Sequence, residues 1–293
     1  RGLGDVYKRQ VLKENGYYNL FFMTHEGQYD NMNAFFRTNG YDEVFSQENY
    51  PADKVVNSFG VQDDFLYDYA IPVLNQRAAT GQPFFATLLS ISNHPPYVIP
   101  PFFHPKTSEP ETQIVEYADW ALRQFFEEAR KQPWFDNTIF VLEGDHGKLV
   151  GDAECELPES YNHIPLMIYS SRIQPEEKTT FGGQVDIQPT ILGLLNIDYL
   201  QNNFGVDLLK EERPCMFYTA DNMVVGRNDT LLYLYNYETQ QELTYDIGNG
   251  KLNAVPMDDS FLPLKEYSFS MLQSAEFLVK HGKTLNSIPF TQQ

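Results

Sequence analysis

An aspartate and a histidine stand side by side near the middle of the chain, in the sequence Gly144-Asp145-His146-Gly147. A carboxylate next to an imidazole supplies two of the side-chain donors that bind divalent metals such as zinc or manganese. The glycines on either side let the backbone turn sharply and approach a ligand closely. A single Asp-His pair is more often an ordinary surface turn than a metal site, so its meaning depends on what surrounds it.

Three further histidines stand at the borders of predicted strands. Residues 138–142 form a short apolar run, typical of a buried parallel strand, that ends just before the Asp-His pair. His25 and His94 follow two other such runs, and His163 directly precedes one. The carboxyl ends of parallel strands share one edge of a sheet. We therefore expect His94 and the Asp-His pair to converge there, with His163 entering from a loop.

The hydrophobic pattern predicts alternating strands and helices over the first two thirds of the chain. Strands are expected at residues 17–23, 41–45, 84–91, 138–142 and 164–169, and helices at 30–38, 62–79, 114–131 and 186–195. Asp186 stands at the start of the last helix, where a carboxylate is stabilising. This alternation predicts an α/β fold with a mostly parallel sheet flanked by helices.

The pattern changes near residue 214 to short strands followed by one helix. Strands are expected at 216–219, 223–226, 231–235 and 242–245, with a hairpin turn at Asn228-Asp229 and a last helix at 264–279. We expect one compact domain over residues 11–293, in which 214–293 forms an antiparallel flank and terminal helix. Residues 1–10 do not resemble the rest of the chain and are interpreted as a non-native cloning or assembly scar.

Composition excludes several classes of function. The 293 residues carry a net charge of −19, from 40 acidic and 21 basic side chains. Such a chain lacks the basic surface that nucleic-acid binding requires, and it does not adhere to an anionic membrane by charge alone. Cys155 and Cys215 are too few for a disulfide framework and lack metal-site spacing. No run of about 18 apolar residues predicts a membrane span.

The ordered set of segments resembles the alkaline phosphatase and sulfatase superfamily. Within it, the chain is most similar to the lipoteichoic acid synthase-like phosphoglycerol transferases and their sulfatase-annotated relatives. Residues 138–147 (Thr-Ile-Phe-Val-Leu-Glu-Gly-Asp-His-Gly) look like the metal-binding signature of the superfamily. Four further segments match in the same order, at 92–97 (Ser-Asn-His-Pro-Pro-Tyr), 117–122, 161–169 and 185–190. The resemblance implies an alkaline phosphatase-like fold and a metal-dependent enzyme.

The resemblance also implies which residues bind metal. Asp145 and His146 match the ligands of the main catalytic metal, and His163 matches a histidine that serves a second metal in the phosphoethanolamine transferase branch. The implied cofactor is a divalent metal, manganese or zinc, or calcium if the protein is a true sulfatase. The family attacks phosphoesters or sulfoesters with a metal-activated Thr, Ser or formylglycine and forms a covalent intermediate.

Three more residues match the substrate side of the family's pocket. His94 is expected to contact the substrate phosphate or a second metal, and His25 and Asp30 to line the head-group side. The implied substrate is an anionic head group linked to a lipid or a glycan. The resemblance further implies a full-length protein anchored in the membrane, with this domain on the extracytoplasmic face.

The sequence departs from the family pattern at its beginning. In the family, the nucleophile and an acidic metal ligand lie upstream of the segment that contains His25, and no residue before Tyr17 matches either. No Cys-x-Pro-x-Arg or Ser-x-Pro-x-Arg sulfatase motif is present. We therefore expect the carboxyl-terminal part of a catalytic domain, inactive by itself. The alternatives are a sulfuric ester hydrolase and a catalytically dead binding domain of the same fold.

Overall fold

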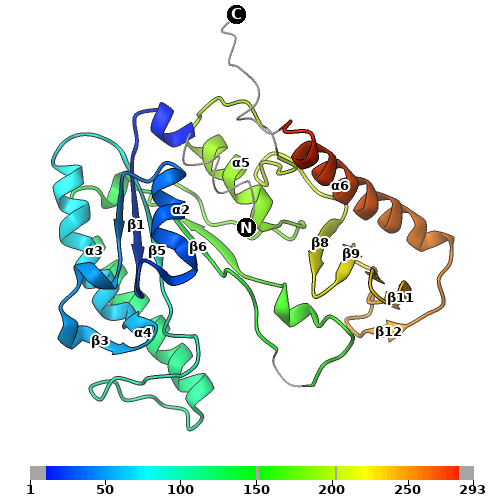
Figure 1. Cartoon of the computed structure of the whole chain (residues 1–293), viewed down its shortest axis with the longest axis horizontal. Helices are drawn as coiled ribbons and strands as arrows, with labels where there is room; N and C mark the ends of the chain where they lie inside the picture. The colour runs from blue at the N-terminus through cyan, green and yellow to red at the C-terminus, as the bar shows by residue number, and fades with distance from the viewer. Residues whose placement is uncertain (1–10, 150–151, 202, 284–293) are drawn as a thin grey trace, which may run out of the picture. The chain divides into compact units, whose positions relative to one another are not determined.

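The computed structural model describes residues 11–149, 152–201 and 203–283 (Figure 1). Residues 1–10, interpreted above as a scar, lie outside the described residues. The chain divides into two compact units, each of which is described by itself. Unit 1 runs to Ile139 and includes residues 170–173; unit 2 consists of Phe140–Tyr169 and the chain from Gln174 onward.

Unit 1 is built on a parallel sheet of three strands in the order β2-β1-β5. The strands are β1 (Tyr18–Met23), β2 (Glu43–Phe45) and β5 (Phe84–Leu89). Leu20 of β1 lies opposite Glu43 on one side and Ala86 on the other, so β1 is the central strand. Because it has a neighbour on each side, β1 is almost fully buried. The predicted parallel sheet is confirmed, and the carboxyl ends of its strands share one edge.

Three helices accompany this sheet, namely α2 (Met32–Thr38), α3 (Asp63–Ala78) and α4 (Pro110–Ala129). Phe21 of β1 stacks on Phe36 of α2, with ring centroids 3.8 Å apart. Helix α3 contacts both β1 and β5 and packs against α4. Fully buried Tyr117 of α4 donates a hydrogen bond to the Asp64 carboxylate of α3 at 2.5 Å. The three predicted helices are thus confirmed, and α3 and α4 bury apolar residues such as Leu66 and Ile114.

A short hairpin in unit 1 has no counterpart in the sequence-based prediction. It consists of β3 (Val55–Asn57) and β4 (Gly60–Val61), which pair antiparallel. The strands are too short to show an alternating apolar pattern, so periodicity gives no signal for them.

Unit 2 begins with the strand predicted to carry the Asp-His pair at its end. β6 (Phe140–Glu143) pairs antiparallel with β7 (Leu166–Tyr169), with Val141 opposite Ile168. The expectation of a buried parallel strand at 138–142 is therefore wrong, since the partner runs in the opposite direction and no residue of either strand is fully buried. An apolar run specifies a strand, but it does not specify the partner that the returning chain brings alongside.

The rest of unit 2 contains a five-stranded antiparallel sheet in the order β12-β11-β10-β9-β8. Its strands are β8 (Met216–Ala220), β9 (Met223–Arg227), β10 (Leu231–Asn236), β11 (Gln241–Asp246) and β12 (Asn253–Ala254). The predicted turn between β9 and β10 is confirmed, because the Asn228 side-chain oxygen accepts the backbone N–H groups of Thr230 and Leu231. Helix α6 (Leu262–Lys280) packs against β8 and β9.

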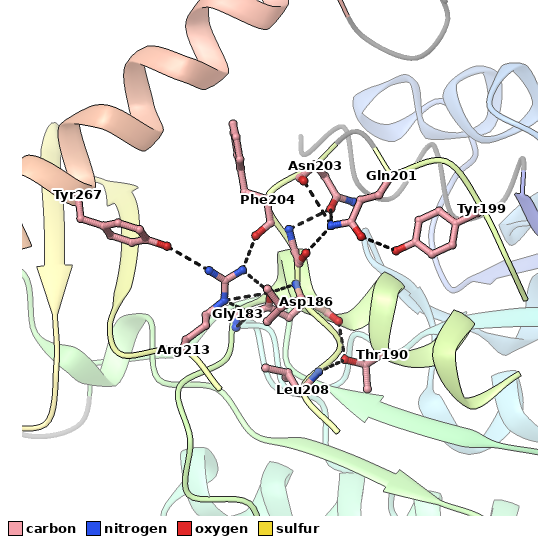
Figure 2. A network of polar contacts seen from close by, with 12 residues as sticks. Gly183, Asp186, Thr190, Tyr199, Gln201, Asn203, Phe204, Leu208, Arg213 and Tyr267 are labelled. Carbon is pink, nitrogen blue, oxygen red and sulfur yellow. Dashed lines mark hydrogen bonds and ion pairs between the residues drawn. The ribbon is translucent and has the colours of Figure 1, made fainter. Parts of the chain in front are cut away.

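Helix α5 (Gln184–Leu194) is anchored by a fully buried carboxylate in its first turn. Asp186 accepts the backbone N–H of Gly183, which caps the helix, and forms an ion pair with the buried Arg213 at 2.5 Å. Figure 2 shows that the Arg213 guanidinium also reaches the Phe204 carbonyl and the Tyr267 hydroxyl of α6. One charged pair thus joins α5, the loop after it and α6.

Two further features bear on the sequence analysis. Among the described residues, no helix combines the length and the apolar character that crossing a bilayer requires. Cys155 and Cys215 are both free thiols, the second of them buried.

We predict that Arg213→Met destabilises the protein strongly. The substitution leaves the Asp186 carboxylate buried without its cation, which costs about 3 kcal/mol in the free energy of unfolding. Urea denaturation measures this quantity. The control is Arg123→Met, because Arg123 pairs with Asp119 at 3.6 Å on the surface, with both side chains more than 60% exposed. That change costs less than about 1 kcal/mol; equal losses for the two variants would contradict the role given to the buried pair.

Candidate functional site

The Asp145-His146 pair lies in the turn that follows β6, just beyond its carboxyl end. Backbone hydrogen bonds attach this turn to the segment that precedes β7. The Gly147 N–H donates to the Tyr161 carbonyl at 2.8 Å, and the Gly144 N–H donates to the Pro165 carbonyl at 3.4 Å. The segment that contains His163 therefore lies beside the Asp-His turn within unit 2.

The close approach of the two segments requires a glycine at position 147. A Cβ atom on Gly147 would lie 1.9 Å from the Ser160 carbonyl oxygen, which no side chain tolerates. Gly144 is less restricted, because its Cβ would lie 3.4 Å from the Ile164 side chain, an ordinary contact. Of the two glycines that flank the pair, the second thus determines how the turn packs.

Hydrogen bonds within the turn orient the two side chains. Oδ1 of Asp145 accepts the His146 N–H at 2.9 Å, and Nδ1 of His146 lies 2.7 Å from the Gly147 carbonyl oxygen. Since a carbonyl only accepts hydrogen bonds, Nδ1 carries the imidazole proton and Nε2 presents its lone pair. This backbone contact is the kind that orients metal-binding histidines.

The remaining ligand atoms of the pair, Oδ2 of Asp145 and Nε2 of His146, fit one divalent cation. Nε2 of His146 lies 3.8 Å from Oδ2 of Asp145, and the side chains are 70% and 76% exposed. Two ligands that each lie about 2.1 Å from one ion are less than about 4.2 Å apart, so both atoms can reach the same ion. Within neither unit do the described residues form a larger group, of three or more His, Cys, Asp or Glu side chains, that could hold a metal.

His163 is placed by its backbone. Its N–H donates to the Glu159 carbonyl at 2.8 Å, at the end of a single 3₁₀ turn over Glu159–Tyr161. The same turn supplies the Tyr161 carbonyl that binds Gly147. The structure therefore brings His163 and the Asp-His pair onto adjoining segments, and its role as a metal ligand stays a prediction.

The predicted substrate residues His25 and Asp30 follow β1 in unit 1. His25 is 2% exposed, and its Nδ1 lies 3.1 Å from the Glu26 carbonyl oxygen. Its ring lies 4.8 Å from that of Tyr29. Asp30 is exposed and has a φ of 48°, in the left-handed region, within a 3₁₀ turn (Tyr29–Asn31) just before α2. This turn lies in the loop between β1 and α2, as expected for a loop at the carboxyl end of a sheet strand.

His94 lies in the loop after β5. Like β1, this strand of the parallel sheet is thus followed by a candidate residue. Its Nδ1 lies 2.7 Å from the Pro95 carbonyl oxygen, so Nε2 is again the unprotonated nitrogen. The ring borders a small open pocket, whose walls include Val56, Phe59 and Val98. The pocket lies entirely within unit 1.

Phe59, at the tip of the β3–β4 hairpin, is a site residue that the sequence analysis missed. Its ring lies 4.4 Å from that of His94 and 6.3 Å from that of Tyr29, which contacts His25. The hairpin is seated directly on the end of β1, because a Cβ on Gly60 would lie 1.7 Å from the Thr24 carbonyl oxygen. Gly60 has a φ of 89°, and this glycine is the one sequence signal that marks the hairpin.

A buried carboxylate anchors the loop that carries His94. Asp63, at the start of α3, is 2% exposed and accepts the backbone N–H groups of Ile91 and Ser92 at 2.9 and 3.1 Å. The Ser92 hydroxyl donates in turn to the Gln62 side chain at 2.9 Å. Burial raises the pKa of Asp63, and the two backbone donors lower it only in part. The loop therefore leaves β5 in a defined direction.

The candidate residues thus fall into two groups. The three substrate residues lie in unit 1, at the ends of β1 and β5, and the three metal residues lie in unit 2, around the turn after β6. Within each group the fold brings the segments together. That the two groups form one site stays a prediction.

A family model described as Sulfatase matches residues 9–197. The chain is 27% identical over 243 residues to lipoteichoic acid synthase 1 of Bacillus subtilis, and 27% identical over 241 residues to phosphoglycerol transferase I of Xanthomonas campestris. These alignments cover 75% and 78% of this chain. They cover 36% and 34% of the relatives, so the chain spans about a third of their length.

One solved structure shows the same fold. It is a protein of the alkaline phosphatase superfamily from Vibrio parahaemolyticus, with 28% sequence identity and a TM-score of 0.80. The superposition covers 92% of this chain and 68% of that chain. The predicted alkaline phosphatase-like fold is confirmed.

We predict that Gly147→Ala distorts the turn. The added methyl group forces the backbone away from Ser160 and breaks the hydrogen bond to Tyr161, at a cost of about 2 kcal/mol in the free energy of unfolding. Urea denaturation measures the loss. Gly144→Ala is the matched control, since its methyl group meets only an ordinary contact, and it is expected to cost less than about 1 kcal/mol. If the two variants were equally stable, the close packing of the turn on 160–161 would be refuted.

Proposed function

We propose a function for this chain, which belongs to the sulfatase family. It forms part of a metal-dependent enzyme that transfers or hydrolyses a phosphoester-linked head group. The relatives it matches are named as a lipoteichoic acid synthase and a phosphoglycerol transferase, which favours phosphoester chemistry over sulfate ester hydrolysis. The observation that carries the proposal is the Asp145-His146 pair at the end of β6, with both free donor atoms 3.8 Å apart.

The residues of unit 2 would hold the cation. Oδ2 of Asp145 and Nε2 of His146 would be ligands of a manganese or zinc ion, or of calcium if the substrate is a sulfate ester. His163 would add a ligand for a second ion. A bound divalent cation supplies Lewis acidity and lowers the pKa of a nucleophile that it coordinates. The hydrogen bond from Nδ1 of His146 to the Gly147 carbonyl leaves Nε2 as the ring nitrogen that would bind the cation.

The residues of unit 1 would bind the substrate. Because Nδ1 of His94 donates to the Pro95 carbonyl, Nε2 is the ring nitrogen left to contact a head-group hydroxyl or a phosphate oxygen. His25 and Asp30 would lie on the head-group side. Because the chain carries a net charge of −19, an anionic substrate needs such local donors and the metal to be held.

A lipid- or glycan-linked substrate of this kind would lie at the cell envelope. We propose that the full-length protein is anchored in the membrane and acts on its extracytoplasmic face, as the resemblance to the phosphoglycerol transferases implies. The partner in this account is a lipid- or glycan-linked anionic substrate.

We predict that Asp145→Asn and His146→Ala each reduce kcat/KM at least about 100-fold toward a chromogenic phosphodiester, because each removes a ligand of the metal that activates the nucleophile. The assay uses the full-length protein with manganese, zinc or calcium, and chelation is expected to reduce the rate similarly. The matched control is His281→Ala. His281 also places Nδ1 on a backbone carbonyl, at 2.8 Å from Phe277, but it has no assigned role, so its loss should leave kcat/KM unchanged.

A comparison of substrates distinguishes the alternative functions. Faster turnover of a sulfate ester than of phosphate esters would identify a sulfatase, and metal binding without any turnover would identify a binding domain.

His163→Ala is expected to lower turnover while the melting temperature stays nearly constant. Extensive unfolding without a specific kinetic loss would instead make His163 a structural residue.

A further inference from the structure

Gln184, the first residue of α5, reaches back to the turn that carries the Asp-His pair. Its Nε2 donates to the Asp145 carbonyl oxygen at 2.8 Å and to the Gly144 carbonyl oxygen at 3.2 Å. The side chain therefore bridges two consecutive peptide groups of the turn. Among the described residues, Gln184 is the partner that the structure gives to the Asp145 carbonyl.

The backbone position of Gln184 is unusually well fixed for an exposed residue. It lies between Gly183, whose N–H donates to Asp186 at 2.9 Å, and Asp186 itself, which is fully buried. Asp186 also accepts the Val206 N–H at 2.8 Å and pairs with Arg213 (Figure 2). The amino end of α5 is thus held by a buried ion pair and by backbone hydrogen bonds, so its first side chain starts from a rigid support.

The contact acts on the peptide groups that direct the metal ligands. The Asp145 carbonyl belongs to the peptide that joins Asp145 to His146, and the N–H of this same peptide donates to Oδ1 of Asp145. Rotation of the peptide would therefore move the carboxylate and the imidazole together. Gln184 opposes that rotation by binding the Asp145 carbonyl, while the hydrogen bond from the Gly147 N–H to Tyr161 holds the next peptide group of the turn.

We propose that Gln184 is a positioning residue for the metal ligands: by binding the carbonyls of Gly144 and Asp145 from the fixed amino end of α5, it holds the Asp145-His146 pair in its metal-binding geometry. This inference rests on the proposed function, because it assigns Gln184 a role toward the cation that Asp145 and His146 would bind. Groups that orient metal ligands without touching the metal typically change its affinity by about 10- to 100-fold.

The test is Gln184→Met, which keeps the length of the side chain and removes its donor. For this variant of the full-length protein, isothermal titration with Mn²⁺ or Zn²⁺ alone should show about tenfold weaker binding than for the wild type. The matched control is Gln113→Met, because Gln113 is partly exposed, lies near the start of a helix and donates through Nε2 to the Thr107 carbonyl at 2.9 Å. The control should bind both ions as the wild type does, with a similar melting temperature.

Hydrogen exchange of the Gly147 amide in metal-free protein gives a second readout. Without Gln184 the turn opens more often, so this amide should exchange at least about fivefold faster, while amides of the β8–β12 sheet keep their rates. Metal affinity within twofold of the wild type together with an unchanged Gly147 rate would overturn the inference. If the wild type bound neither ion, the proposed function would fail, and the exchange rate alone would decide whether Gln184 holds the turn.

Discussion

The conformation of the turn at residues 144–147 is the constraint on which the candidate metal site depends. A carboxylate and an imidazole that are adjacent in sequence do not ordinarily point to one ion, because consecutive side chains of an extended chain project to opposite sides. Here hydrogen bonds hold the turn at three places: the His146 N–H binds the Asp145 carboxylate, the Gly144 and Gly147 N–H groups bind carbonyls of the segment at 160–165, and Gln184 binds the Asp145 carbonyl. The result is two free donor atoms 3.8 Å apart on an exposed surface.

Stability and function share the same supports in unit 2. The buried Asp186–Arg213 pair contributes to the fold by joining α5 to the loop after it and to α6, and it also fixes the residue that contacts the turn. In unit 1, buried Asp63 plays a comparable part, because its carboxylate anchors the loop that carries His94. In both units, a buried carboxylate at the start of a helix thus supports an exposed loop with a candidate residue.

Much of this arrangement could be predicted from the sequence, because it is encoded locally. Apolar runs and amphipathic periodicity gave the strands and helices, and the position of His94 and of the Asp-His pair at strand ends followed from them. What remained hidden depends on contacts between distant segments. The antiparallel pairing of β6 with β7 is a choice of partner, the role of Phe59 depends on where a short hairpin is seated, and Gln184 acts through carbonyls 39 and 40 residues away.

The central claim is that Asp145 and His146 bind one divalent cation, and anomalous diffraction tests it most directly. Crystals of the protein grown with zinc, with data collected on both sides of the zinc absorption edge, should show an anomalous peak about 2.0–2.2 Å from both Oδ2 of Asp145 and Nε2 of His146. Anomalous peaks that all lie away from these two atoms, in crystals saturated with zinc, would contradict the account.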